Sequence, residues 1–394
     1  MEFALNEEQG ALTALAKDFC KREVSPEFLR ELLEREPKDR MPWDLIKKMH
    51  DLGLRTLTVP EEYGGGGADL LTQVLVSETL GQYGGPVGAV LTPMWRLCGS
   101  LAAVGNKEQQ DEIFNRVKSD YTFFMHEIIT EPDHGHDPLL PHNEPGSGLK
   151  TFAHRDGDEY VINGEKCFCG NTSADLFWVH LRTDKNKPLS QSMSLLLVPR
   201  DAPGFSVTRI NEFIVPKVRL NGDLLFDNVR VPARNLVGEE GKGGDIFQGR
   251  LAFSLPGLGV QLGKTQEIYE VTKDYAKTRI QGGKPIFEHP TVGTKIVDML
   301  THIEQARLLV YKTAWEYDQA VKSGKKLVSP LGFNLCNAVM HELGILVAGH
   351  AAEVWGGRAT LKELPIEGYI RSVYDHHHFL GTATFNRIKA MSMI

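Results

Sequence analysis

The sequence has little cysteine for its length and no excess of positive charge. Its five cysteines (Cys20, Cys98, Cys167, Cys169 and Cys336) form an odd, scattered set among 394 residues. That set argues against a disulfide framework and favours a reducing compartment. The formal net charge is −7, so nothing in the overall charge favours nucleic acid or an anionic membrane surface as a partner.

Membrane and targeting segments are also missing. We find no apolar run of the roughly 20 residues that cross a bilayer, and the N-terminus "MEFALNEEQG" lacks the basic and apolar parts of a signal peptide. A cytoplasmic location is therefore the expectation. With 41% hydrophobic and 24% charged residues, the composition is that of an ordinary globular protein, and the length permits two or three domains.

The periodicity of apolar residues changes twice along the chain. Residues 1–120 show helical spacing, as in Leu12, Leu15, Ala16 and Phe19, and predict an N-terminal α-helical domain. Residues 121–236 hold short strand-like segments such as "DLFWVHLRTD", "MSLLLVPRD" and "LLFDNVRVP", and predict an antiparallel β-domain. Within it, Asn163-Gly164 predicts the turn of a β-hairpin.

Residues 237–394 return to helical spacing with longer patterns. Apolar stripes within 291–324 and 331–357 are about 25 residues or longer, which predicts a helix bundle or a helical oligomer interface. The glycine-rich segment 59–70 lacks the Gly-x-x-x-x-Gly-Lys pattern of a phosphate-binding loop and is interpreted as a link between helices. The class is α+β, with the helices and strands segregated along the chain.

Seven short segments along the chain together carry a resemblance to a known family. The segments are "VPEEYGGGG" (59–67), "ITEPDHGHD" (129–137), "INGEKCFCGN" (162–171), "LLFDNVRVPARNLVGEEGKGG" (224–244), "AKTRIQGGKPI" (276–286), "EVWGG" (353–357) and "RSVYDHHHFLGT" (371–382). In this order they match motifs of the acyl-CoA dehydrogenase flavoenzyme family, which the chain resembles over essentially its whole length. The resemblance implies the fold of that family, with a C-terminal four-helix bundle.

The resemblance implies FAD, bound between the β-domain and the bundle with help from a neighbouring subunit, and a homo-oligomer, dimer or tetramer. It implies α,β-dehydrogenation of an acyl-CoA or other acyl thioester, with an external electron acceptor such as an electron-transfer flavoprotein. The positions matching substrate contacts are Thr92, Arg250, Leu380 and Gly381. Those matching cofactor contacts are Ile129, Thr130, His136, Phe168, Gly170, Arg279, Trp355, Gly356, Gly357, Thr382 and Thr384.

The family's catalytic base is absent from both of its usual places. Most members carry a Glu before the Gly-Thr of the last motif, where this chain has Leu380. A minority carry it before an Arg on the first C-terminal helix, where Gly249 precedes Arg250. A general base contributes a factor of roughly 10²–10⁴. The flavin motifs depart too: Phe168 replaces a Trp and Gly170 a Thr.

Three residues are candidates for the missing catalytic function. His126 shares strand parity with Thr130, so its side chain should point toward the flavin; the alternative is an ordinary β-domain histidine. Glu127 points the other way and is expected to play no part. His378 belongs to the run His376–His378, whose side chains cannot share one helical face, so the run is interpreted as a solvated or interface segment and no metal site is predicted. Arg250 should border the active site; the alternative is a helix-surface arginine.

Other charged residues receive lesser roles. Glu131 and Asp137 are expected to brace the flavin loop. The stretch "YGGPVGAVLTPMWRL" (83–97) offers only Arg96 as a cation, so a substrate with a second acidic group is not indicated and an apolar pocket is expected.

The leading hypothesis is a FAD-dependent oxidoreductase acting on an acyl thioester with a relocated proton-transfer residue. Two alternatives stay open. The first is that the chain is a catalytically incomplete subunit of a hetero-oligomeric acyl-CoA dehydrogenase. The second is that it is a flavin-assisted non-redox lyase or monooxygenase with the same fold.

Overall fold

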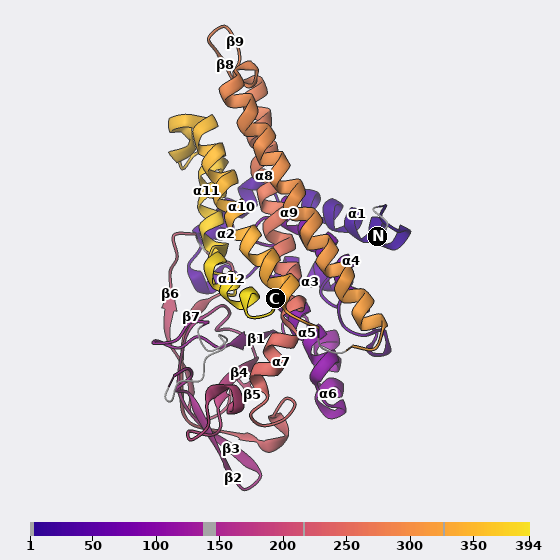
Figure 1. Ribbon diagram of the computed structural model, residues 1–394, viewed down its shortest axis with the longest axis vertical. Coiled ribbons are helices and arrows are strands. Elements are labelled where there is room, and N and C mark those ends of the chain that lie inside the picture. The colour runs from indigo at the N-terminus through magenta and orange to yellow at the C-terminus, as the bar shows by residue number, and fades with distance from the viewer. Residues whose placement is uncertain (1–3, 137–146, 216, 326–327) are drawn as a thin grey trace.

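The computed structural model describes residues 4–136, 147–215, 217–325 and 328–394. Figure 1 shows a tall helical bundle standing on a β-sheet, with the N-terminal helices beside the bundle. Helices fill the N-terminal and C-terminal thirds and strands fill the middle. The order predicted from periodicity is confirmed.

Six α-helices make up the N-terminal part. The first, α1, begins with a capping box, in which Asn6 and Gln9 each bond the other's backbone N–H through their side chains. Ala16 and Phe19 of the predicted stripe are fully buried. The helices are α1 (Glu7–Glu23), α2 (Pro26–Glu34), α3 (Trp43–Asp51), α4 (Leu70–Gly84), α5 (Thr92–Val104) and α6 (Lys107–Ser119).

The middle part is a seven-stranded sheet of order β1-β4-β2-β3-β7-β6, with β5 paired to β4. Its pairings are mostly antiparallel, but β1 and β2 both run parallel to β4. The strands are β1 (Met125–Ile128), β2 (Phe152–Asp156), β3 (Glu159–Cys169), β4 (Leu176–Arg182), β5 (Met193–Pro199), β6 (Phe205–Asn211) and β7 (Asn221–Pro232).

The hairpin turn predicted at Asn163-Gly164 is wrong. Those residues lie inside β3, and the turn between β2 and β3 falls at Gly157, whose φ of 62° suits glycine. A register shift on β7 marks the Asn-Gly position instead. There Asn163 accepts the backbone N–H of Asn228 at 2.9 Å. The unusual backbone that Asn-Gly favours is thus used for a bulge rather than a turn.

The C-terminal part contains the two long helices predicted from sequence. They are α9 (Pro290–Lys322) and α10 (Leu331–Trp355), and they pack with α8 (Leu255–Thr278) and α11 (Pro365–His376). Shorter elements complete the part: α7 (Gly243–Gly249), α12 (Ala383–Met391) and the hairpin of β8 (Ile280–Gln281) and β9 (Lys284–Pro285).

One helical segment, Leu331–Thr360, is long and apolar enough by composition to cross a membrane, which the sequence reading did not anticipate. Its most apolar window is 61% buried inside the molecule, and α10 contacts α8, α9, α11 and α12. Burial on several sides is typical of the core helix of a bundle.

Close helix packing joins the N-terminal part to the bundle. A Cβ on Gly81 of α4 would overlap the backbone of Val260 on α8, and one on Gly263 of α8 would overlap the backbone of Glu78. The absence of side chains therefore allows the two helices to approach closely. This contact fixes α4 and α8 as two walls of the cavity described next.

Candidate active site

A cavity of about 450 Å³ lies where the three parts of the chain meet. Its walls come from α2, α4, α8 and α11, from segment 217–221 before and at the start of β7, and from Gly170 just after β3. A volume of this size is within the range of small-molecule sites. Since Gly170 is a predicted flavin contact, the cavity reaches the predicted cofactor position.

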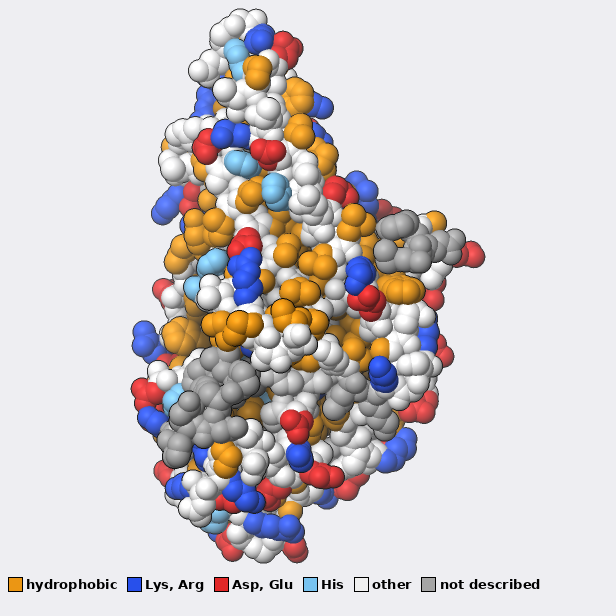
Figure 2. All heavy atoms as spheres, in the orientation of Figure 1, with side chains coloured by type: hydrophobic (Ala, Val, Ile, Leu, Met, Phe, Trp, Pro, Cys, Tyr) orange, Lys and Arg blue, Asp and Glu red, His pale blue; other side chains and the backbone are white. Residues whose placement is uncertain are grey.

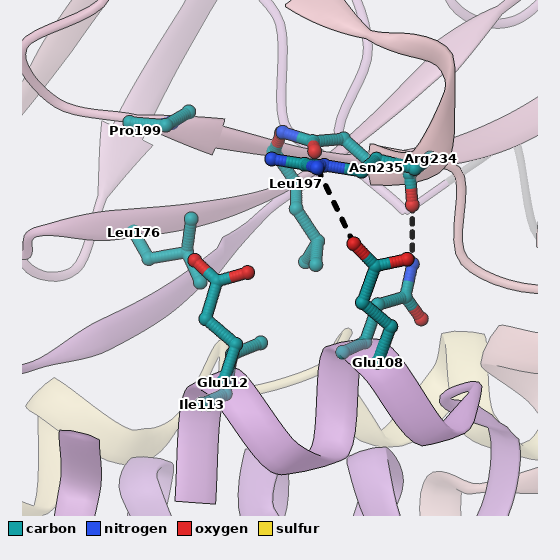
Figure 3. A pocket seen from close by; sticks show the side chains of 9 residues that line it. Glu108, Glu112, Ile113, Leu176, Leu197, Pro199, Arg234 and Asn235 are labelled. Atoms are coloured by element: carbon teal, nitrogen blue, oxygen red, sulfur yellow. Dashed lines mark hydrogen bonds and ion pairs between the residues drawn. The ribbon is translucent and has the colours of Figure 1, made fainter. Parts of the chain in front are cut away.

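A second hollow, between α6 and the sheet, is far smaller. Figure 3 shows Glu108 of α6 facing Arg234, with the two side chains 3.3 Å apart. The hollow measures about 60 Å³, which is room for a few water molecules and not for an acyl thioester. We therefore place the candidate active site in the larger cavity.

His126 lies at the flavin side of that cavity, in contact with Gly170. Its Nε2 accepts the Gly170 N–H at 2.9 Å. Burial, together with the charges of Arg219 and Arg96, lowers the pKa of His126 to about 3. The ring is neutral at physiological pH and its accepting nitrogen is already occupied, so His126 is poorly suited to take a proton from a substrate.

Beside His126 is a buried ion cluster that the sequence analysis did not predict. Glu127 forms ion pairs with Arg250 and Arg96 and contacts His180 Nε2 at 2.7 Å. Burial disfavours the carboxylate, but the two guanidinium groups and His180 hold the pKa of Glu127 well below its usual range. Burial lowers the pKa of His180 to about 4, so at neutral pH the cluster contains two cations and one anion.

Two expectations are corrected by this cluster. Glu127, which was expected to play no part, is only 2% exposed and joins three elements of the fold. Arg250 is equally buried, so the reading of it as a helix-surface residue is wrong. Its guanidinium also donates to Ser100 at 3.1 Å and lies over the ring of Trp178. A sequence signal existed: single charges inside "FFMHEII" and "PMWRLCG" stand among apolar residues.

The lining of the cavity is mostly apolar, but a group of cations, which the stretch 83–97 gave no reason to expect, also faces it. Lys217, Arg219 and Lys264 all line it. Burial lowers the pKa of Lys217 to about 7, of Arg219 to about 10 and of Lys264 to about 8, and neighbouring cations add to each shift.

One carboxyl group in the cavity has a raised pKa. Glu267, one turn beyond Lys264 on α8, lines the cavity, and burial raises its pKa to about 6 with help from Glu270 and Asp274. Two other acids line the cavity: Glu363 is exposed, and Glu367 pairs with Arg371. Glu267 differs from both of these acids, because it is partly buried and forms no ion pair with any described residue.

The C-terminal loop, where the resemblance placed the usual base of the family, lies away from the cavity walls. Leu380 has φ of 52° and Gly381 of 92°, so the chain turns sharply here. Leu380 packs on the bundle core, His378 is exposed, and Thr382 caps α12 by accepting the N–H of Phe385 at 3.3 Å. The side chain of His376 lies outside the described structure. None of the predicted substrate contacts, Thr92, Arg250, Leu380 and Gly381, is among the residues lining the cavity.

The predicted cofactor residues of the sheet cluster next to the C-terminal loop. Glu131, between the predicted contacts Thr130 and His136, accepts the N–H groups of Lys150 and Thr151 and the buried ammonium of Lys166 at 2.7 Å. It braces this segment as expected; Asp137 lies outside the described residues. His136 lies between the rings of Phe247 of α7 and Phe385 of α12. Ile129 is buried, whereas Thr384 is exposed.

The remaining predicted cofactor residues lie at the far end of the bundle. Arg279 is the C-cap of α8, about 36 Å from the start of that helix at 1.5 Å per residue. Near it, Trp355 stacks on Tyr275 at 3.9 Å and is followed by Gly356 and Gly357. The help from a neighbouring subunit that the resemblance implied stays an expectation.

The sheet residues fit a flavin ring. Phe168 has a left-handed φ of 54° and is 62% exposed, an unusual state for a large apolar side chain, and it lies two residues from Gly170 at the cavity. A planar ring resting there would cover it. Glu353, the acidic first residue of the "EVWGG" segment, is paired with Lys295 at 2.6 Å. When bound, FAD would supply the hydride acceptor.

Comparisons with known proteins agree with the three-part fold. Family models match all three parts: the acyl-CoA dehydrogenase N-terminal domain over residues 6–120, the middle domain over 127–229 and the C-terminal domain over 241–388. The chain therefore belongs to the acyl-CoA dehydrogenase family, and it is an acyl-CoA dehydrogenase-like flavoenzyme.

Individual relatives match along nearly their whole length. A probable acyl-CoA dehydrogenase of Bacillus subtilis is 31% identical over 401 residues, covering 98% of each chain. Among solved structures, butyryl-CoA dehydrogenase from Megasphaera elsdenii has a TM-score of 0.88 at 26% identity, covering 100% of this chain and 99% of its own. A structure described as an electron-transferring flavoprotein of Acidaminococcus fermentans matches with the same TM-score, identity and coverage.

Proposed function

We propose that this protein catalyses FAD-dependent α,β-dehydrogenation of an acyl thioester with a relocated proton acceptor, Glu267. The family supports the reaction class. The observation that carries the proposal is that Glu267 and Gly170 line one cavity. A carboxyl group in that cavity can meet a substrate lying beside the flavin position, whereas Leu380 and Gly249 have no group that accepts a proton.

The chemistry of Glu267 suits proton abstraction. The α-proton of a thioester is weakly acidic, so its removal needs a base whose pKa is close to the working pH. With a pKa raised to about 6, Glu267 is mostly ionised at pH 7 and is a stronger base than an exposed carboxylate. The groups around it are Glu270 and Asp274 on α8 and Tyr369 on α11, whose pKa is raised partly by Glu267.

The test is flavin reduction under anaerobic conditions in Glu267→Gln, with a panel of acyl-CoA thioesters. We expect the rate of bleaching to fall by roughly 10²–10⁴ while FAD content stays at the wild-type value. The wild-type rate should rise as pH increases through about 6, because the carboxylate is the active form, and the variant should lose this dependence. Glu363→Gln, an exposed acid of the same cavity, is the matched control. An unchanged rate in Glu267→Gln would refute the assignment.

We further propose a homo-oligomer, dimer or tetramer, in the cytoplasm, with an external electron acceptor such as an electron-transfer flavoprotein. Support for the oligomer comes from exposed apolar side chains on α9, α10 and α12, among them Val297, Leu308, Leu335 and Met391. Figure 2 shows apolar side chains gathered over the middle of the bundle. Light scattering on the purified protein should give a mass of two or four chains, and a monomer would contradict the proposal.

A second candidate function is a catalytically incomplete subunit that pairs with a complete homologue. Leu380 and Gly249, at both usual base positions, favour it. A homo-oligomer purified alone with one FAD per chain and turning over a thioester would exclude this candidate. Lyase or monooxygenase chemistry would instead be indicated by conversion of a thioester without an enoyl product.

A further inference from the structure

The interior around the cavity carries more positive than negative charge. In the buried cluster, Arg96 and Arg250 share the single carboxylate of Glu127. Arg219 lies close enough to Arg96 for their charges to interact unfavourably. Burying like charges together is costly, and buried charges in proteins are normally paired.

The imbalance is greatest on the cavity wall itself. Arg219 and Lys264 form no ion pair with any residue of the described chain. The charges of both residues help to lower the pKa of Lys217, and the charge of Arg219 helps to lower that of Lys264. Two of these side chains come from the segment before β7 and the third from α8. Three cations from two separate elements thus converge on one water-accessible hollow.

Among the described residues, no acid of the cavity forms an ion pair with Arg219 or Lys264. Glu267 interacts with Glu270, Asp274 and Tyr369, which lie toward the C-terminal end of α8 and on α11. Glu367 is paired with Arg371, and Glu363 is exposed. The other basic residues of the wall, Arg30 and Lys362, add further positive charge.

We propose that Arg219 and Lys264, together with Lys217, bind an oxyanion carried by the substrate, either a carboxylate or a phosphate. The inference rests on the proposed function for the presence of a thioester, and it adds a specificity site to that function. A guanidinium binds either oxyanion through two parallel hydrogen bonds, and the ammonium groups add charge-assisted ones. A bound anion would relieve the repulsion among the three cations.

The two sources of the oxyanion make different predictions. A carboxylate on the acyl group would make succinyl-CoA bind more tightly than butyryl-CoA, which has a methyl group in place of the carboxylate. A phosphate of the CoA moiety would make both thioesters bind equally and would leave the butyryl thioester of pantetheine, which lacks these phosphates, as the weak ligand.

The experiment is calorimetric titration of the purified holoprotein with these three thioesters, in wild type, Arg219→Gln and Lys264→Gln. Loss of a charge-assisted contact should weaken the anion-bearing ligand about 10- to 100-fold. Lys264→Arg, which keeps the charge, should retain most of the affinity and shows that any loss is not a folding defect. Lys38→Gln, which changes an exposed lysine outside the cavity, should change affinity less than twofold.

A preference for succinyl-CoA, or for both CoA thioesters over the pantetheine thioester, supports the site if the two variants remove it. Which preference is seen identifies the source of the oxyanion. The proposal is overturned if Arg219→Gln and Lys264→Gln fold and bind all three thioesters as the wild type does. This failure differs from a failure of the proposed function. Bleaching of the flavin by butyryl-CoA, together with unchanged binding of both succinyl-CoA and butyryl-CoA in Arg219→Gln and Lys264→Gln, would retain the reaction and reject the anion site.

Discussion

Glu127→Gln tests the buried ion cluster beside the cavity. The substitution keeps the shape of the side chain but leaves Arg96 and Arg250 without their shared carboxylate. Removing one partner of a buried ion pair typically costs about 3–5 kcal/mol, because the remaining charge is uncompensated. The upper part of this range applies, since Glu127 and Arg250 are each only 2% exposed and two cations lose one anion.

The assay is equilibrium unfolding in urea, followed by circular dichroism and tryptophan fluorescence. The matched control is Glu342→Gln, which removes an ion pair with Arg387 at 2.6 Å. Both side chains of that pair are 54% exposed, so this substitution should cost no more than about 1 kcal/mol. The pKa of Glu127 is lowered in the folded protein, so its stabilisation is complete above about pH 5 and declines in acid. The cost of Glu127→Gln should decline with it. A cost below about 1 kcal/mol at pH 7 would refute the reasoning.

Three further predictions concern packing, the flavin segment and pH. Gly263→Ala should destabilise the protein by about 1–3 kcal/mol or more through overlap with the backbone of α4, whereas Gly349→Ala, which has open space in α10, should be neutral or stabilising in the same thermal melts. Lys166→Met removes the ammonium partner of buried Glu131 and should lower stability by about 3–5 kcal/mol. It should also weaken FAD retention, measured as flavin release. Full FAD retention at wild-type stability would contradict this prediction. Anion affinity should fall as pH rises from about 7 through about 8, because Lys217 and then Lys264 lose their protons. Calorimetry at pH 6.5 and 9 would show equal affinities if neither lysine were a ligand.

Helices and strands were predictable because their determinants are local. The apolar stripe of residues 12–19 and the long patterns before and after residue 324 each need only neighbouring residues to be recognised. Asn163-Gly164 misled because the same local conformation serves a turn or a bulge, and the choice depends on Asn228 in a strand 65 residues away.

The charged site was not predictable in the same way. Strand alternation correctly separates His126 from Glu127, yet it does not reveal that Glu127 faces arginines from α5 and from just after α7. The cationic wall joins Arg219 to Lys264, which are 45 positions apart in sequence, on different elements. The family motif shows that Leu380 stands where the base is expected, whereas Glu267 was indicated as a replacement only by its place in the cavity.

The structure of the holoprotein with a non-oxidisable acyl-CoA analogue tests the central claim most directly. Glu267 is predicted to lie with a carboxylate oxygen about 3–3.5 Å from the α-carbon of the analogue, in the cavity that Gly170 lines. An analogue bound elsewhere, or an α-carbon that faces another side chain, would contradict the account.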